Sequence, residues 1–299
     1  MKLSELTPDQ RAALQRMRRG MARSDKKRDA GLTTPEEITR VDDLHYGPAR
    51  KWNALDLYYP RGASAPLPTI VSVHGGGYIY GTKEVYQFYC MDLARRGFAV
   101  VNFNYHLAPV HPYPTPLREL NRLLGWVCEH AAEYPVDPDN LFLVGDSAGA
   151  QLVSQYALIW ADPDYAAQMG IRPPAFRLAA LGLNCGLYDL RAAAEADGAP
   201  GFYFAGDPQA ARSPELDVLG RIDSRYPPAY VVSAANDFLL ESWAPMLELL
   251  RARGVAAEGR VYGTPEDKTA CHVFHCNVRL PLAARCNDDE TAFLRRFVR

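Results

Sequence analysis

Long apolar runs are missing from this 299-residue chain, and its charges almost cancel. No hydrophobic stretch approaches the roughly 20 residues that a membrane-spanning helix needs, so we expect no membrane association. The first residues contain no apolar core of a signal peptide, which favours a cytoplasmic protein. Asp and Glu (35) nearly balance Lys and Arg (33), so the net charge of -2 gives no reason to expect a nucleic-acid partner.

Cysteine is also scarce. Six cysteines in a chain of this length do not make a disulfide framework. Cys90, Cys128 and Cys185 stand in apolar surroundings and are interpreted as buried small hydrophobic residues. The segment 271–276, with Cys286 nearby, brings cysteine and histidine together, but it has no Cys-x2-Cys spacing and no second ligand pair. We therefore expect neither a metal nor another cofactor.

The most informative segment is a Gly-x-Ser-x-Gly turn, Gly145-Asp146-Ser147-Ala148-Gly149. The apolar run 141–144 precedes it and a helix-compatible run follows it, so Ser147 is predicted at a sharp strand-to-helix turn. The small glycines relieve crowding there and leave the serine hydroxyl exposed. The start of the helix directs backbone N–H groups toward developing negative charge. An ordinary glycine-rich turn is the structural alternative.

A second glycine motif, His74-Gly75-Gly76-Gly77, follows the β-branched run 69–73. Consecutive glycines let the backbone approach a ligand closely and leave N–H groups unpaired. A flexible loop is the alternative for this motif alone. An HGGG loop upstream of a nucleophile elbow, with both motifs at strand ends, is the pattern of lipases and esterases.

These motifs, with Asn104-Tyr105-His106-Leu107-Ala108-Pro109, resemble the hormone-sensitive-lipase-like family of microbial esterases. The last segment is similar to the family's Tyr-Arg-Leu-Ala-Pro-Glu, with His106 replacing the arginine and Val110 replacing the glutamate. The likeness extends from about residue 50 to the C-terminus. It implies an α/β-hydrolase fold.

Strands that alternate with helices predict a mostly parallel central sheet with helices on both faces. The strands are expected at 52–59, 69–73, 99–103, 141–144, 178–183, 229–234 and 258–262, and the helices at 84–96, 115–134, 149–161, 240–253 and 286–298. We expect an α/β-hydrolase catalytic domain at 46–299 and an N-terminal helical extension at 1–45.

The N-terminal extension begins its helix at Thr7-Pro8-Asp9-Gln10, a capping pattern, and is expected to stay helical to about Arg19. Residues 11–28 carry eight Lys or Arg and one acid. This composition is typical of a solvated helix face, with an anion-seeking arm as the alternative. The irregular stretch 184–228 is expected to join the N-terminal helix in a small lid, with a long surface loop as the alternative.

A nucleophilic serine needs a base and an acid, which follow it in the order acid, then histidine, in α/β-hydrolases. Asp237 follows the expected strand 229–234, at the sheet edge where such folds place their sites, although it could instead cap the next helix. His272 and His275 both follow the last strand. His272-Val273-Phe274 resembles the family's His-x-Phe, so we expect His272 to be the base and His275 to cap or pack.

The combined pattern predicts a serine carboxylesterase that cleaves a small-molecule ester through an acyl-enzyme. Ser147, Asp237 and His272 are the expected catalytic residues, and the N–H groups of Gly76, Gly77 and Ala148 are the expected oxyanion hole.

Tyr78 and Tyr80 are expected to line the substrate pocket, although aromatic residues at this spacing also serve in packing. We expect short acyl groups of about two to four carbons, acetyl among them. An amidase or formamidase with the same triad and a non-catalytic ligand-binding module on this fold are the alternatives. A homodimer is compatible with the sequence.

Overall fold

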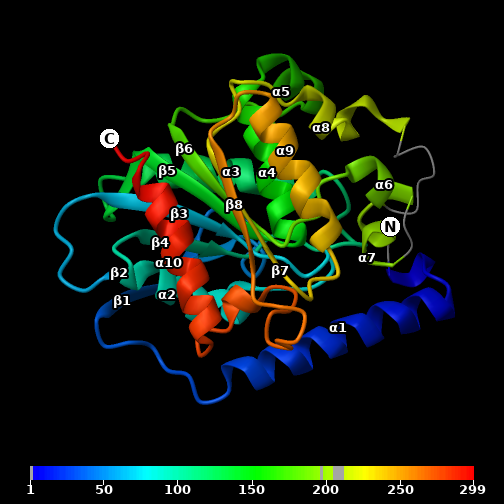
Figure 1. Cartoon of the computed structure of the whole chain (residues 1–299), viewed down its shortest axis with the longest axis horizontal. Coiled ribbons are helices and arrows are strands. Elements are labelled where there is room, and N and C mark those ends of the chain that lie inside the picture. Colours follow the sequence, from blue (N-terminus) through cyan, green and yellow to red (C-terminus); the bar gives the residue numbers. More distant parts are fainter. Residues whose placement is uncertain (1–2, 196–197, 205–211) are drawn as a thin grey trace.

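The computed structural model describes residues 3–195, 198–204 and 212–299. Its centre is an eight-stranded sheet with the strand order β1-β2-β4-β3-β5-β6-β7-β8 (Figure 1). β2 pairs antiparallel with β1 and β4, and every pair from β4 to β8 is parallel. The predicted α/β-hydrolase fold with a mostly parallel sheet is confirmed. The strands are β1 (Ile38–His45), β2 (Ala54–Pro60), β3 (Leu67–Val73), β4 (Ala99–Phe103), β5 (Val136–Asp146), β6 (Leu178–Asn184), β7 (Ala229–Ala234) and β8 (Ala257–Tyr262).

Helices cover both faces of this sheet. The α-helices among the described residues are α1 (Pro8–Asp29), α2 (Lys83–Arg95), α3 (Thr115–Glu129), α4 (Ala148–Ala161), α5 (Pro163–Met169), α6 (Leu190–Glu195), α7 (Ala199–Tyr203), α8 (Val218–Arg221), α9 (Trp243–Ala252) and α10 (Pro281–Arg295). Alternate residues of a strand point to opposite faces. In β3, Ile70 therefore packs in the core under α2 and α10, whereas Val71 and Val73 pack in the core under α3, α4 and α9.

The N-terminal helix α1 lies along the rim of the molecule, outside the layers that flank the sheet (Figure 1). It begins as predicted, with a capping box between Thr7 and Gln10. It continues ten residues beyond the predicted end at Arg19, because contacts with the catalytic core reach its last turn. The Arg18 guanidinium donates to the carbonyl oxygens of Ile79 and Ala108, and the Arg28 guanidinium donates to that of Val85.

Residues 38–45, which sequence analysis placed in the helical extension, form strand β1 and pair with β2. The sheet therefore starts before the predicted domain boundary at residue 46. The polar residues of β1 hid this strand from a search for apolar runs, since only Ile38 is buried.

The segment 184–228, expected to be irregular, contains α6, α7, α8 and the 3-10 helix η3 (Pro214–Leu216), while its residues 196–197 and 205–211 lie outside the described part. α7 packs on the loop after β3, where the ring of Tyr203 stacks on that of Tyr78 at a centroid distance of 3.8 Å. The contribution of the whole segment to a lid stays a prediction.

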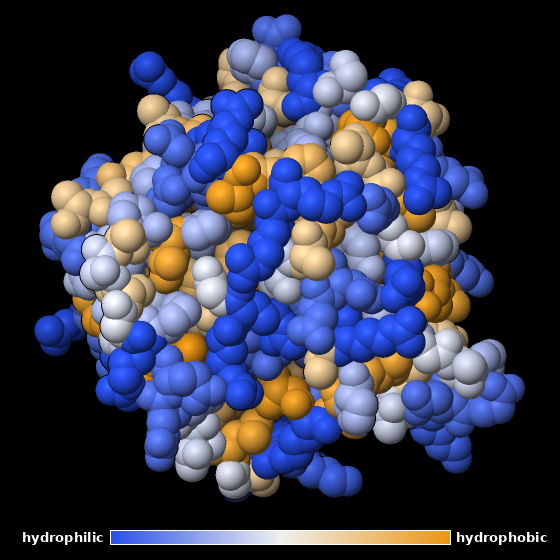
Figure 2. All heavy atoms as spheres, turned by 60° about the vertical axis from the view of Figure 1, so that its left-hand side comes forward, coloured by the Kyte–Doolittle hydropathy of each residue, from blue (hydrophilic) through white to orange (hydrophobic). Residues whose placement is uncertain are grey.

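The surface carries hydrophobic side chains in small groups between hydrophilic ones on the face that Figure 2 shows, which is the left-hand side of Figure 1 brought forward. Within the ranges 3–195, 198–204 and 212–299, none of the helices combines the length and the apolarity that crossing a bilayer requires.

Candidate active site

Ser147 occupies the sharp turn between β5 and α4. Its backbone has φ +53° and ψ -119°, a conformation that residues other than glycine rarely adopt. The turn can lie close to the end of β3 because Gly149 packs directly on the backbone of Val73 and His74. A Cβ atom at Gly149 would collide with the Val73 carbonyl oxygen. The strain at Ser147 lifts its side chain out of the helix and leaves it facing a cavity, as expected for a nucleophile elbow.

Two side chains from later loops form a hydrogen-bonded line with this serine. Nε2 of His272 lies 3.0 Å from Oγ of Ser147, and Nδ1 of His272 lies 2.7 Å from Oδ1 of Asp237. Asp237 follows β7 and His272 follows β8, so the carboxyl ends of neighbouring parallel strands bring both loops to Ser147. The structure thus brings the three predicted catalytic residues together.

The carboxylate of Asp237 is fixed in place by further donors. The Ser233 hydroxyl donates to its Oδ2 at 3.0 Å, and the Leu239 N–H donates to its Oδ1 at 2.9 Å. Burial alone would raise the pKa of Asp237. The hydrogen bond and charge of His272, with the Leu239 N–H, outweigh burial and lower this pKa to about 2. Asp237 is therefore ionised at neutral pH and oriented toward His272.

His275, the alternative base, lies elsewhere. Its ring is fully buried and meets the Tyr89 ring edge-on, with centroids 5.1 Å apart. Its Nδ1 atom has no hydrogen-bond partner among the described residues. Burial lowers the pKa of His275 to about 3, so the ring is neutral. It therefore packs in the core, in the 3-10 helix η5 (Phe274–Cys276).

The glycine loop after β3 turns beside Ser147. Gly76 has φ +100°, and a Cβ atom there would collide with the Tyr80 carbonyl oxygen, so only glycine fits this turn. Among the described residues, none accepts a hydrogen bond from the N–H of Gly76 or Gly77. His74 anchors the loop from below: it is fully buried and stacks on Tyr105 with ring centroids 4.1 Å apart. Burial lowers the pKa of His74 to about 4, so it contributes packing rather than charge.

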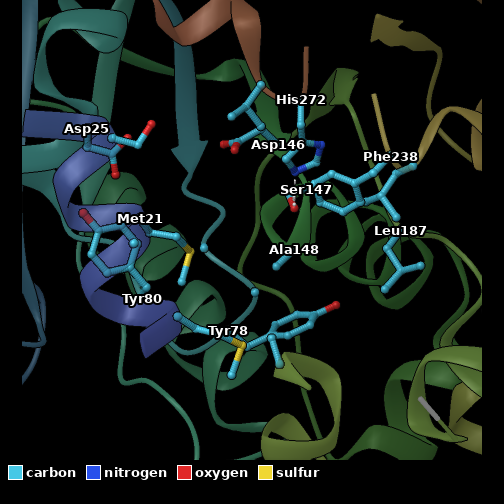
Figure 3. A pocket seen from close by; sticks show the side chains of 18 of the residues that line it. Met21, Asp25, Tyr78, Tyr80, Asp146, Ser147, Ala148, Leu187, Phe238 and His272 are labelled. Atoms are coloured by element: carbon cyan, nitrogen blue, oxygen red, sulfur yellow. Dashed lines mark hydrogen bonds between the residues drawn. The ribbon is translucent and has the colours of Figure 1, made fainter. Parts of the chain in front are cut away.

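A cavity of about 630 Å³ opens over Ser147. Figure 3 shows Ser147 between two walls. One wall comes from α1 and the loop after β3, and the other from the loops after β6 and β7. Of the labelled side chains, Met21, Asp25 and Tyr80 lie on the first side and Leu187 and Phe238 on the second. The exposed ring of Phe238 lies against His272, with ring centroids 4.1 Å apart.

The two tyrosines predicted to line the pocket do so in different ways. Tyr80 is half-buried and its side chain borders the cavity on the α1 side. Tyr78 also borders the cavity, but its side chain is 1% exposed. Its ring stacks on Tyr203 and its hydroxyl donates to Gln151 of α4 at 3.0 Å. Tyr78 therefore ties the glycine loop to the helix that follows Ser147, a packing role that sequence analysis held as the alternative.

Two clusters of side chains have metal-ligand chemistry. Asp146, His275 and Cys276 form one, and Cys185, Asp237 and His272 form the other, with candidate atoms within 4.8 Å of one another. The second cluster is the hydrogen-bonded line itself. In the first, Asp146 already accepts hydrogen bonds from protein donors.

Of the three cysteines expected in apolar surroundings, Cys90 and Cys185 are buried and Cys128 is half-buried.

Sequence analysis gave no role to Asp146, the residue before Ser147. It is 3% exposed and accepts hydrogen bonds from the Tyr86 hydroxyl at 2.8 Å and the Gly75 N–H at 3.2 Å. It thereby links the elbow to the glycine loop. Burial raises the pKa of Asp146 to about 6, although Tyr86, His272 and Gly75 act in the opposite direction.

Asp146 is expected to make stability pH-dependent. The unfolded chain has an aspartate pKa of about 3.9, so the folded state binds the Asp146 proton more tightly, and its stability falls as pH rises from about 4 to about 6. Asp146→Asn should remove this loss, which is of the order of 2–3 kcal/mol. Urea unfolding of both proteins at about pH 4 and pH 7 measures it. A difference between the two proteins that stays constant with pH would contradict the expectation.

Comparison with known proteins identifies the family of the chain. A family model described as alpha/beta hydrolase fold matches residues 70–275. Esterase LipI of Mycobacterium tuberculosis is 30% identical over 239 residues, which cover 74% of this chain and 72% of that protein. Carboxylesterase NlhH of the same organism is 30% identical over 222 residues, covering 68% of this chain and 66% of NlhH.

Among solved structures, Esterase B from Lactobacillus Rhamnosis superposes with a TM-score of 0.86 at 25% identity, covering 97% of this chain and 96% of that one. Fold, family match and relatives therefore agree: the chain belongs to the α/β-hydrolase family, in its hormone-sensitive-lipase-like branch, and is a serine carboxylesterase.

Proposed function

We propose that this carboxylesterase hydrolyses short-chain esters with Ser147, His272 and Asp237 as a catalytic triad and an acyl-enzyme as the intermediate. The observation that carries the proposal is the continuous hydrogen-bonded line from Asp237 through His272 to Ser147, which ends in a cavity beside the glycine loop. Each residue has the partner that its role requires.

In the first half-reaction, Nε2 of His272 takes the Ser147 proton while Oγ bonds to the ester carbonyl carbon. The carbonyl π electrons move onto oxygen, and the ionised Asp237 stabilises the imidazolium that forms. The N–H groups of Gly76, Gly77 and Ala148 are the proposed donors to this oxyanion. Loss of one such donor typically lowers the rate by about 10²–10³.

The tetrahedral intermediate then collapses: the oxyanion re-forms the carbonyl while the bond to the alkoxide breaks. His272 gives its proton to the departing alkoxide, which leaves Ser147 acylated and completes the first half-reaction. Water then replaces the alcohol. His272 takes a proton from the water as its oxygen attacks the acyl carbon, and returns the proton to Oγ as the carboxylic acid leaves. The original Ser147 proton has left with the alcohol and a proton from water has replaced it, so the enzyme is ready for the next ester.

The cavity supports a preference for small acyl groups. Bulky side chains border Ser147 on both sides: Met21 and Tyr80 on one, Leu187 and Phe238 on the other. An acyl chain must fit between these walls, and each methylene that the pocket cannot house forfeits about 1–3 kcal/mol of discrimination.

We therefore expect kcat/KM to peak at acyl groups of about two to four carbons. A series of p-nitrophenyl esters from acetate to decanoate measures this preference, with the matched p-nitroanilides to compare esters with amides. Peak activity on decanoate would contradict the pocket interpretation. Faster cleavage of the anilides would favour the amidase alternative, and no turnover of either series would favour a binding module.

A further inference from the structure

α1 carries a row of cations along its exposed face. Five basic residues are spaced by three, four, three and one positions, which places them on one side of an α-helix. All five side chains are exposed. They are Arg16, Arg19, Arg23, Lys26 and Lys27, and we call this row the cationic stripe.

Among the residues that the structure describes, no neighbouring acid pairs with the stripe. The acids of α1 lie elsewhere on it: Asp25 and Asp29 both pair with Arg28, and Asp9 lies in the first turn. In the part of the chain that the structure describes, no salt bridge reaches any of the five cations.

This arrangement opposes helix stability. Like charges three or four positions apart repel one another, as in the pairs Arg16–Arg19, Arg19–Arg23 and Arg23–Lys27. The helix dipole favours cations in the last turns of a helix, which accounts for Lys26 and Lys27. It does not account for Arg16 and Arg19 in the middle of α1. Charge interactions within α1 therefore do not account for the central part of the stripe.

The stripe reaches the cavity over Ser147 at one of its five residues. Arg16 lines this cavity, and so do Gly20 and Ser24, one and two helical turns further along α1. Figure 3 shows how closely α1 approaches the site, with Met21 and Asp25 on the side of the cavity opposite Phe238. Two other charged side chains of the lining, Asp25 and Arg28, form an ion pair at 3.0 Å. The fourth, Asp146, is buried and accepts hydrogen bonds from protein donors. Arg16, which has no salt bridge among the described residues, therefore brings positive charge to the cavity wall.

Positive charge is concentrated in α1, and the rest of the chain has a net negative charge. α1 holds eight Lys or Arg against three Asp or Glu, a net charge of +5. The other residues hold 25 against 32, a net charge of -7. A positive field is thus concentrated beside the cavity of a molecule that is otherwise negative. Such a field raises the local concentration of anions and the rate at which they arrive.

We propose that the cationic stripe selects esters whose alcohol portion carries a carboxylate or a phosphate. The anionic group lies at Arg16, and the short acyl group lies at Ser147. This inference rests on the proposed esterase function and adds the charge of the substrate to it. A soluble ester fits better than a lipid surface, because the Met17 and Met21 side chains of α1 face the cavity and its exposed face is charged.

The test compares two esters that differ only in charge, 3-acetoxy-4-nitrobenzoate and its neutral carboxamide. The readout is the ratio of kcat/KM for the anionic ester to kcat/KM for the neutral one. We expect this ratio to exceed one by about three- to tenfold at low salt and to fall toward one at about 0.3 M salt, where charges are screened. A ratio near one at every salt concentration would overturn the inference.

Variants identify the source of the preference. Changing all five stripe residues to Gln should bring the low-salt ratio close to one, and a general loss of activity cancels in the ratio. The control removes the same charge from exposed residues that do not line the cavity: Arg50, Lys51, Arg251, Arg253 and Arg285, each to Gln. The control variant should keep the wild-type ratio. Equal loss in both variants would overturn the inference, since net charge alone would then explain the preference.

Further outcomes distinguish this inference from a membrane-docking role of α1 and from the proposed esterase function. Stripe-dependent binding to phosphatidylserine vesicles, with no preference for the anionic ester, would overturn it in favour of a membrane-docking helix. Wild-type protein that hydrolyses neither ester would fail the proposed function itself. Hydrolysis of the neutral ester with a charge ratio near one would leave the esterase proposal standing and reject only the role of the stripe.

Discussion

Ser147→Ala is expected to lower kcat on p-nitrophenyl acetate by about four to six orders of magnitude, because the acyl-enzyme can no longer form. The fold should persist. Alanine has the same Cβ atom as serine, so it meets the same backbone strain at φ +53° without adding to it. Steady-state kinetics and thermal unfolding of the purified variant measure both effects.

The serine of the adjacent helix provides a control for the Ser147 substitution. Ser154 lies on α4, is buried and contacts the Tyr226 hydroxyl, away from the cavity. Ser154→Ala should keep kcat within about tenfold of wild type, since it touches none of the reacting groups. Activity retained by Ser147→Ala, in a preparation free of wild-type enzyme, would refute its role as nucleophile.

His272→Ala is expected to have the second-largest effect, a loss of about four or more orders of magnitude in kcat, because the Ser147 hydroxyl loses its base. The matched control is His275→Ala. Its ring is buried, and the hydrogen bond to Oγ of Ser147 comes from His272 instead, so kcat/KM should change by less than about tenfold while the melting temperature falls.

The pair of histidine variants distinguishes a catalytic from a structural effect. If His275→Ala abolished turnover while retaining its fold and His272→Ala did not, the base would have to be reassigned. Circular dichroism of both variants guards against the misreading of an unfolded protein as an inactive one.

Much of the fold was predictable from sequence because buried parallel strands are continuous apolar runs, such as 69–73 and 141–144. The elements that were not predicted are those whose formation depends on tertiary contacts. The polar strand β1 forms because β2 offers it an edge. The second half of α1 is held by the contacts of Arg28 and Arg279, whose guanidinium donates to the carbonyl oxygens of Arg28 and Ala30.

The site divides in the same way. Strand ends and residue order pointed to Ser147, Asp237 and His272, and the structure brings these side chains together, although their catalytic roles stay predictions. Residues whose role is packing have no recognisable local pattern in the sequence. Asp146 looked like part of a motif, and only the fold reveals its burial against Tyr86.

Tyr78 is a second residue whose packing contacts could not be predicted from sequence. The sequence predicted Tyr78 at the pocket, which it borders, but could not identify Gln151 and Tyr203, the distant partners of its side chain. Such pairings depend on how separate segments pack, and no spacing along the chain records them.

The most direct test of this account is covalent labelling of the native enzyme with a p-nitrophenyl alkylphosphonate, followed by peptide mass spectrometry. A phosphonate with a short alkyl group mimics the tetrahedral intermediate, and the activated serine attacks its phosphorus. The account predicts one label per chain, on Ser147, with loss of activity in proportion to labelling and no label on Ser147→Ala. A label on another residue, or full activity after complete labelling of Ser147, would contradict it.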